Sequence, residues 1–179
     1  IQKIMKTWNI DTTHSEIGFK VKHLMISTVR GLFSSFEGSI SAEDESFDGG
    51  QISFSADVSS IDTKNAQRDG HLKSADFFDA ENFPKLTFSS ASVKKVGDNN
   101  LEITGDLTMR GVTKSVSLNA SVTGVVKGMD GAQVAGFEIS GKINRSEFGL
   151  VWNAPLETGG VVVSDSATIE ALIEAKEQA

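Results

Sequence analysis

Apolar and polar residues alternate along most of the chain, in short runs that turn residues separate. The clearest runs span residues 17–23, 52–58, 101–107, 116–122 and 137–143. Successive side chains of a strand point to opposite faces of a sheet, so this period of two indicates strands with one buried face. About eight such runs at hairpin spacing, with no change of composition between them, predict one all-β domain.

The last run, residues 161–175, contains Ala and Glu, which favour helices. Its alternation is nevertheless sustained, and a closed barrel needs a last strand that pairs with the first, which we expect at Trp8–Asp11. An all-β domain of this length is a sandwich or a closed barrel, and about eight strands leave room for a slender ligand. We therefore predict a single antiparallel eight-stranded barrel over residues 5–179, with residues 1–4 as a remnant or an N-terminal extension.

The alternation stops between Ser60 and Phe88, where charged and amide side chains precede a group of aromatic residues. Asp62 or Thr63 is a candidate cap for a short helix, because a short side-chain oxygen can accept a free N–H of the first turn. We predict a helix over Asn65–Lys73 at one end of the barrel. Its apolar partners, expected to pack toward the lumen, are Leu72, Phe77 and Phe78. The segment is either a crossover loop with a small core of its own or a lid over a cavity.

Charge and composition narrow the function. The net charge of −7 gives no basic surplus for nucleic acid, so we expect no nucleic-acid partner. Cysteine is absent, which excludes disulfides and thiolate metal sites. The N-terminal residues lack the apolar region of a signal peptide. The expected location is therefore the cytoplasm, and the alternative is the periplasm if a leader was removed.

Candidate catalytic and metal-binding residues are few. The three histidines do not occur in metal-binding pairs, and the sequence has no HExxH, GxSxG, phosphate-binding loop or GxGxxG motif. We expect no metal and no cofactor. Asp69 and His71 are candidates for an acid–base pair, although residues two apart on a helix point to different sides. His23 lies on the apolar face of its strand, where a hydrogen-bonded core histidine is the commoner case.

Several motifs in a fixed order together resemble the YceI-like family of lipid- and polyisoprenoid-binding proteins. The match runs from Trp8 to about Ile173. The matching positions are Trp8-x-Ile10-Asp11-x-x-His14-Ser15-x-Ile17-x-Phe19, Lys22-His23-Leu24-Met25, Val29-Arg30-Gly31-x-Phe33, Ser60-Ile61-Asp62-Thr63, Asn65-x-x-Arg68-Asp69-x-His71-Leu72-Lys73, Phe77-Phe78, Phe83-Pro84, Gly105-Asp106-Leu107-Thr108-x-Arg110-Gly111-Val112-Thr113-Lys114 and Arg145-x-x-Phe148-Gly149-Leu150.

The resemblance implies a lipocalin-like barrel whose lumen binds a long apolar chain, such as a polyisoprenoid, an isoprenoid quinone or a fatty lipid. It implies sequestration, transport or storage of that lipid and no catalysis. Transient membrane contact and a homodimer are further expectations. The residues expected to contact the ligand are Phe19, Val21, His23, Phe54, Leu72, Phe77, Phe88, Leu107, Leu118, Ile139, Phe148 and Trp152.

Two other functions stay open at this point. The first is an enzyme that uses the same pocket, with Asp69 and His71 or His23 as acid–base groups. The second is a stress-related interaction protein whose barrel is filled by its own side chains. Gly105 and Gly141, which lie on the inward faces of their runs, are expected either to leave room for a ligand or to relieve crowding where a strand bends.

Overall fold

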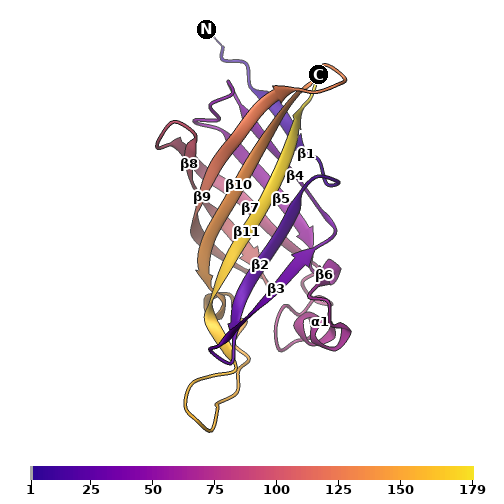
Figure 1. Cartoon of the computed structure of the whole chain (residues 1–179), viewed down its shortest axis with the longest axis vertical. Coiled ribbons are helices and arrows are strands. Elements are labelled where there is room, and N and C mark those ends of the chain that lie inside the picture. The colour runs from indigo at the N-terminus through magenta and orange to yellow at the C-terminus, as the bar shows by residue number, and fades with distance from the viewer. Residues whose placement is uncertain (1) are drawn as a thin grey trace.

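A computed structural model describes residues 2–179, and its strands form one antiparallel sheet (Figure 1). None of the helices in this range is both long and apolar enough to span a membrane. In chain order the elements are β1 (Lys6–Ile10), β2 (Glu16–His23), β3 (Ser27–Phe33), β4 (Phe36–Ala42), β5 (Gln51–Asp57), η1 (Val58–Ser60), β6 (Ile61–Asp62), α1 (Ala66–Lys73), β7 (Lys85–Lys95), β8 (Asn100–Met109), β9 (Val112–Lys127), β10 (Gln133–Asn144), η2 (Arg145–Phe148) and β11 (Val163–Glu177).

Eight strands close the barrel. The ring runs β1-β4-β5-β7-β8-β9-β10-β11, and β11 returns to β1 with Trp8 opposite Glu177 and Ile10 opposite Ala175. This confirms both the eight-stranded barrel and the strand predicted at the C-terminus. β11 is a strand despite the helix propensity of its Ala and Glu residues, because both of its edges pair with other strands.

The other half of β11 pairs with β2, from Leu172 opposite Glu16 to Val163 opposite His23. β3 then pairs with β2, and the short β6 pairs with β3. The pattern over residues 28–40 is therefore divided between β3 and β4, which have different neighbours. The break lies at Ser34 and Ser35, whose backbone N–H groups donate to the carbonyl and hydroxyl oxygens of Ser60.

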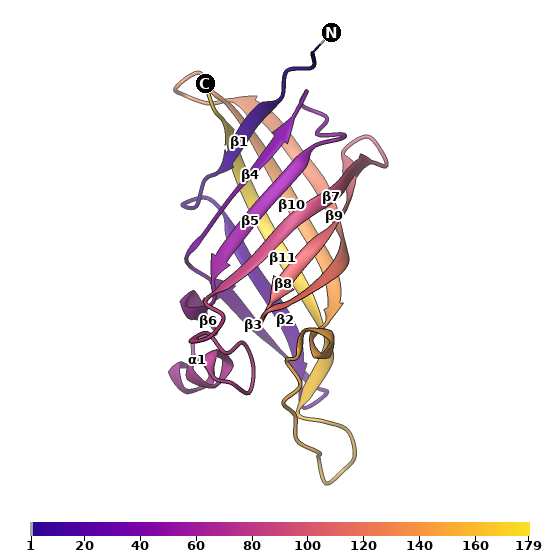
Figure 2. The same ribbon diagram turned by 180° about the vertical axis from the view of Figure 1, so that it is seen from behind.

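The predicted helix is present as α1, and it lies at one end of the barrel beside β6 (Figure 2). Its cap is Asn65, whose side-chain oxygen accepts the Arg68 N–H at 3.0 Å. Asp62 and Thr63 were the wrong candidates, because both are used in the preceding turn. Asp62 accepts the N–H of Lys64 at 2.7 Å, and Thr63 donates its N–H to the carboxylate of Asp69 at 2.8 Å.

The opposite end of the barrel is closed by three aromatic side chains. Trp8 and Phe47 pack edge to face with ring centroids 5.3 Å apart, and Phe47 and Phe137 do the same at 4.8 Å. Phe47 belongs to the acidic turn between β4 and β5, yet it is fully buried. We call these three residues the closed-end cluster. It stops the lumen from running through the molecule.

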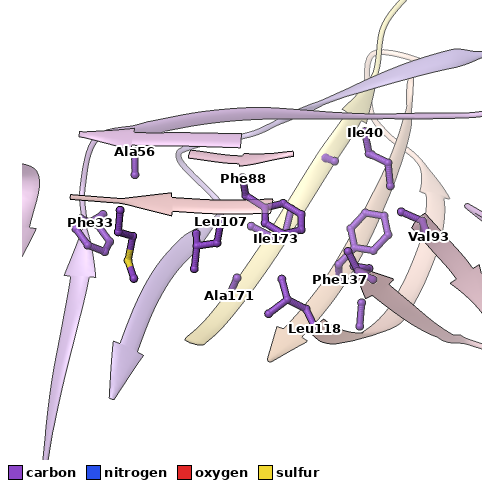
Figure 3. Close-up of a cluster of buried hydrophobic side chains, with 14 of the residues drawn as sticks. Phe33, Ile40, Ala56, Phe88, Val93, Leu107, Leu118, Phe137, Ala171 and Ile173 are labelled. Atoms are coloured by element: carbon purple, nitrogen blue, oxygen red, sulfur yellow. The ribbon is translucent and has the colours of Figure 1, made fainter. Parts of the chain in front are cut away.

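Between the two ends, the inward side chains are apolar (Figure 3). Gly105 and Gly141 lie on the inner face of the wall, where neighbouring side chains approach the glycine backbone closely. A Cβ atom would lie 2.6 Å from the ring of Phe88 at Gly105 and 2.5 Å from the Leu118 side chain at Gly141. The two glycines therefore relieve crowding and do not leave room for a ligand. A bulge in β7 between Ser90 and Ser92 lies opposite Gly105.

Candidate functional site: an apolar cavity in the barrel

A cavity of about 390 Å³ runs inside the barrel, within the range of about 300–1,000 Å³ typical of small-molecule sites. All eight strands of the ring contribute to its wall, together with β2 and β3. Nearly all of the lining side chains are aliphatic or aromatic. Phe137 lines the cavity and also packs on Phe47, so the closed-end cluster forms its floor. The other end, near α1, is its mouth.

The strand orientations predicted from the alternation are confirmed, because the six residues named for them all line this cavity. They are Phe19, Val21, Phe54, Leu107, Leu118 and Ile139. Leu72, Phe77 and Phe78 also line it, as predicted for the helical segment.

Of the residues expected to contact a ligand, His23, Phe88 and Trp152 are on the wall as well. Phe148 is the exception. It is fully buried in η2, where it supports the wall without forming part of it. Ligand contact by the other residues stays a prediction.

An aromatic group stands at the mouth of the cavity. The ring of His71 lies edge-on to Phe77 and to Trp152, with centroids 5.0 Å and 4.8 Å away. The rings of Phe77 and Trp152 are 5.6 Å apart. These three side chains come from α1, from the segment after it and from the loop after η2. Contacts between them therefore join two separate parts of the chain at the entrance.

Asp69 and His71 are not brought together. The carboxylate of Asp69 accepts both the N–H and the hydroxyl of Thr63, whereas Nε2 of His71 lies 2.9 Å from the carboxylate of Asp76. The acid–base pair proposed from the sequence is therefore wrong, because residues two apart on α1 point to different sides of the helix and each side chain contacts another residue.

Arg145 is a buried cation in the wall near the mouth, and only 7% of its surface is exposed. Its guanidinium donates to the carbonyls of Leu150, Trp152, Val163 and Ser164 at 2.7–3.2 Å, and it lies over the ring of Phe77. Burial lowers the pKa of this guanidinium. Sequence reasoning missed it as a wall residue. The signal was its place two residues after Ile143, on the inward face of the same alternation.

A second group of ionisable side chains lies outside the barrel, where β11 changes partner from β2 to β1. Nδ1 of His14 is 2.8 Å from the Asp11 carboxylate and 3.2 Å from that of Glu174. The ligand atoms of these three residues lie within 4.8 Å of one another, a spacing that could admit a cation. Hydrogen bonds from Thr13 and His14 lower the pKa of Asp11 to about 2. The hydrogen bond to Asp11, and then the charges of Asp11 and Glu174, raise the pKa of His14.

Comparison with known proteins decides the family. Residues 8–175 match the model of the YceI-like domain. The chain belongs to the YceI-like family. A UPF0312 protein of Staphylococcus aureus (strain USA300) is 39% identical over 171 residues, which cover 95% of this chain and 97% of that protein.

Two solved structures extend the comparison. A YceI protein of Campylobacter jejuni is 34% identical with a TM-score of 0.76, over 94% of this chain and 96% of that one. A polyisoprenoid-binding domain from Saccharophagus degradans has a TM-score of 0.73 over 96% of this chain and 98% of that one. At 15% identity, this second likeness shows a shared fold. The family has the fold of a binding protein, with a lipocalin-like barrel.

The His14 contacts predict a pH-dependent stability. The folded protein holds this proton more tightly than the unfolded chain, in which a histidine has a pKa of about 6.5. The stabilisation is therefore fully present below that pH and is lost as the pH rises through the folded pKa. We expect the melting temperature of His14→Asn to fall below that of the wild type by more at about pH 5.5 than at about pH 8.5. Circular dichroism melts at both pH values would measure it, and an equal deficit at both would contradict it.

Proposed function

We propose that this protein binds one long-chain apolar lipid in the barrel lumen, and that it sequesters, transports or stores that lipid. The polyisoprenoids and isoprenoid quinones are the candidate classes. The observation that carries the proposal is the cavity itself, which is apolar along its length and closed at one end by Trp8, Phe47 and Phe137. The printed description of the Saccharophagus degradans domain as polyisoprenoid-binding supports the same class of ligand.

The energetics favour exchange of lipid over permanent binding. Burial of an apolar tail is worth about 0.8 kcal/mol per CH₂ against water, so a tail of some twenty carbons would approach the practical ceiling of about 18–21 kcal/mol. The tail needs no polar partner. A free lipid, however, resides in a membrane, and the difference between bilayer and lumen is far smaller. Such a barrel would take up and release its lipid at membranes.

The cavity also bears on the two alternatives. A barrel that served only as a packed core would fill its interior with its own side chains, whereas this one leaves about 390 Å³ between them. An enzyme in the same pocket would need an acid–base pair aimed into it. Asp69 is turned toward Thr63, the pair His71–Asp76 lies at the mouth, and the pair Asp11–His14 lies outside the barrel. His23 lines the cavity, but no described Asp or Glu does. Binding is the function that the geometry supports best.

The hairpin between β2 and β3 supports membrane contact at the mouth. Leu24 and Met25 are the two central residues of the β-turn that the Ile26 N–H closes on the His23 carbonyl. Their φ angles of 54° and 65° lie in the left-handed region, in which large side chains are strained. Asn or Gly would be the ordinary choice there. Met25 is 59% exposed and Ile26 is 82% exposed. We call the exposed residues Met25, Ile26 and Val151 the apolar rim. Figures 1 and 2 show that the β2–β3 hairpin and the loop after η2, which carry these residues, lie at the mouth end of the barrel.

We expect the double substitution Met25→Ser with Ile26→Ser to weaken binding to lipid vesicles about tenfold, since each apolar side chain moved from water to lipid is worth up to about 1.5–3 kcal/mol. Co-sedimentation with vesicles of phosphatidylglycerol and phosphatidylcholine would measure it. The matched control is Val126→Ser with Met129→Ser, because these exposed apolar residues lie in and beside the β9–β10 hairpin, at the opposite end of the barrel. Equal loss in both variants would contradict contact through the mouth.

The lumen is tested by filling it. Leu118 is on the cavity wall, and Leu118→Trp adds volume there at an overpacking cost of about 1–3 kcal/mol. We expect this variant to retain much less of a long-chain isoprenoid quinone than the wild type after incubation and gel filtration, with the lipid quantified by mass spectrometry.

The control is Val126→Trp, which adds a larger apolar side chain to the same strand at a position that is 63% exposed. It should retain as much lipid as the wild type. Equal retention by folded Leu118→Trp would show that the lumen near this residue is not the binding site.

A further inference from the structure

The cavity ends at a definite level on the strands that form its wall. On β10 the wall residues end at Phe137, and the next inward residue, Ala135, is fully buried behind it. On β1 the wall residues end at Ile10, and the next inward residue, Trp8, is 1% exposed. Neither Ala135 nor Trp8 lines the cavity. The depth of the lumen is therefore set by whatever occupies the barrel at this level.

Aromatic rings occupy the barrel beyond that level, because the wall there carries small side chains. Ala135 and Ala175 face each other on β10 and β11, and Ala42 lies on β4. All three are at most 1% exposed. A wall of methyl groups leaves the space between the strands to the rings of the closed-end cluster. Deletion of one ring would therefore leave a cavity, because the neighbouring alanines are too small to fill it.

Phe137 is the ring that faces the lumen. Of the three residues of the closed-end cluster, it alone lines the cavity. Its ring packs on Phe47 at a centroid distance of 4.8 Å, and Phe47 packs on Trp8 at 5.3 Å. Figure 3 shows Phe137 at the opposite end of the buried cluster from Phe33, whose ring packs on Phe78 beside the mouth. A chain that enters at the mouth therefore meets the Phe137 ring before the other two.

Polar groups lie behind the rings. Glu177 is directly opposite Trp8 in the β1–β11 pairing, so the two side chains emerge on the same face of the sheet. Trp8 Nε1 and one carboxylate oxygen of Glu177 are buried and make no hydrogen bond to another described residue. Nζ of Lys6 lies 3.6 Å from the other carboxylate oxygen. Hydrocarbon packed against these groups would leave them without partners, which is unfavourable. The closed end is therefore no continuation of the apolar lumen.

The depth of the lumen follows from strand geometry. Phe137 and Ile143 are the first and last wall residues of β10. The strand between them spans about 20 Å, which is about 15 Å along the barrel axis at the usual strand tilt. Because a carbon–carbon bond is about 1.5 Å long and the chain zigzags, an extended chain of roughly twelve carbons spans this depth.

We propose that Phe137 limits the length of the hydrocarbon chain that the lumen holds, and that Phe47 and Trp8 keep its ring in place. Ligands of the fitting class contribute roughly twelve carbons to the lumen. Carbons beyond that number lie outside the barrel and add little affinity. The proposal rests on the lipid-binding function above and names a residue that determines its specificity.

A homologous series of ligands tests the limit. Straight-chain fatty acids from about eight to about eighteen carbons bracket the expected length, and geraniol, farnesol and geranylgeraniol extend the series to isoprenoid chains. Affinities would be measured by competition with a fluorescent fatty probe, below the concentration at which each ligand forms micelles. In the wild type we expect each added CH₂ to strengthen binding about fourfold until the chain reaches Phe137. Beyond this break in the series, further carbons should change the affinity less than about twofold each.

Variants then assign the break to Phe137. Phe137→Ala should move it to chains about two to four carbons longer, because the deleted ring leaves a cavity of about its own size. Phe137→Leu keeps most of the volume and should move the break less, and it serves as the test if the alanine variant does not fold. The matched control is Phe54→Ala, which deletes the same ring from the side wall of the lumen. Its break should stay at the wild-type length, whatever its affinities. Melting temperatures would establish which variants are folded.

The contrary outcomes are distinct. A break at the same length in the wild type and in the folded Phe137 variants would overturn the assignment to Phe137 and leave the lipid-binding function in place. An equal shift in Phe54→Ala would do the same, because it would show that total volume sets the limit. An affinity that rises with every added carbon to the end of the series would show that there is no limit. No binding of any ligand in the series would overturn the lipid-binding function and the length limit together.

Discussion

The structure depends on the pairing of β11 along both of its edges. One edge is paired with β10 from Ser166 to Lys176, and the other is shared by β2 and β1. Pairing on both sides removes the free edges that an open sheet would expose to other chains. It also fixes the number of strands in the ring, and this number sets the width of the lumen. The His14 side chain lies between the carboxylates of Asp11 and Glu174, at the point where β11 changes partner from β2 to β1.

The closed ring determines what the interior can recognise. An apolar wall can select a lipid tail by its length and width, but it offers no hydrogen bonds that would distinguish one polar group from another. The closed-end cluster of Trp8, Phe47 and Phe137 makes the lumen a pocket with a single entrance. We therefore expect any polar selection of a ligand at the mouth, where Arg68, His71 and Arg145 lie. We propose that the apolar rim at the same end brings that entrance to a membrane surface, where lipids reside.

Much of this arrangement could be predicted from the alternation of the sequence. The period of two placed Phe19, Leu107 and Ile139 on the wall, and it decided the strand at β11, because a barrel wall has one apolar and one polar face. The break in alternation located α1. These features are local consequences of burial, and they depend little on which strands are neighbours.

Other features depend on contacts between distant parts of the chain and could not be predicted in this way. The cap of α1 is Asn65, because Asp62 and Thr63 are used by the turn that joins β6 to the helix. Phe47 lies in an acidic turn, and only the folded barrel shows that its ring fills the closed end. The role of Arg145 follows from carbonyls up to nineteen residues away.

The most direct test of the central claim is to extract the freshly purified protein with organic solvent and identify the extract by mass spectrometry. The account predicts close to one equivalent of a single class of long-chain lipid per barrel, and the same lipid should be released when the protein is unfolded. A folded protein that yields no lipid, and that binds none on incubation with a lipid extract, would contradict the claim that the lumen is a lipid-binding site.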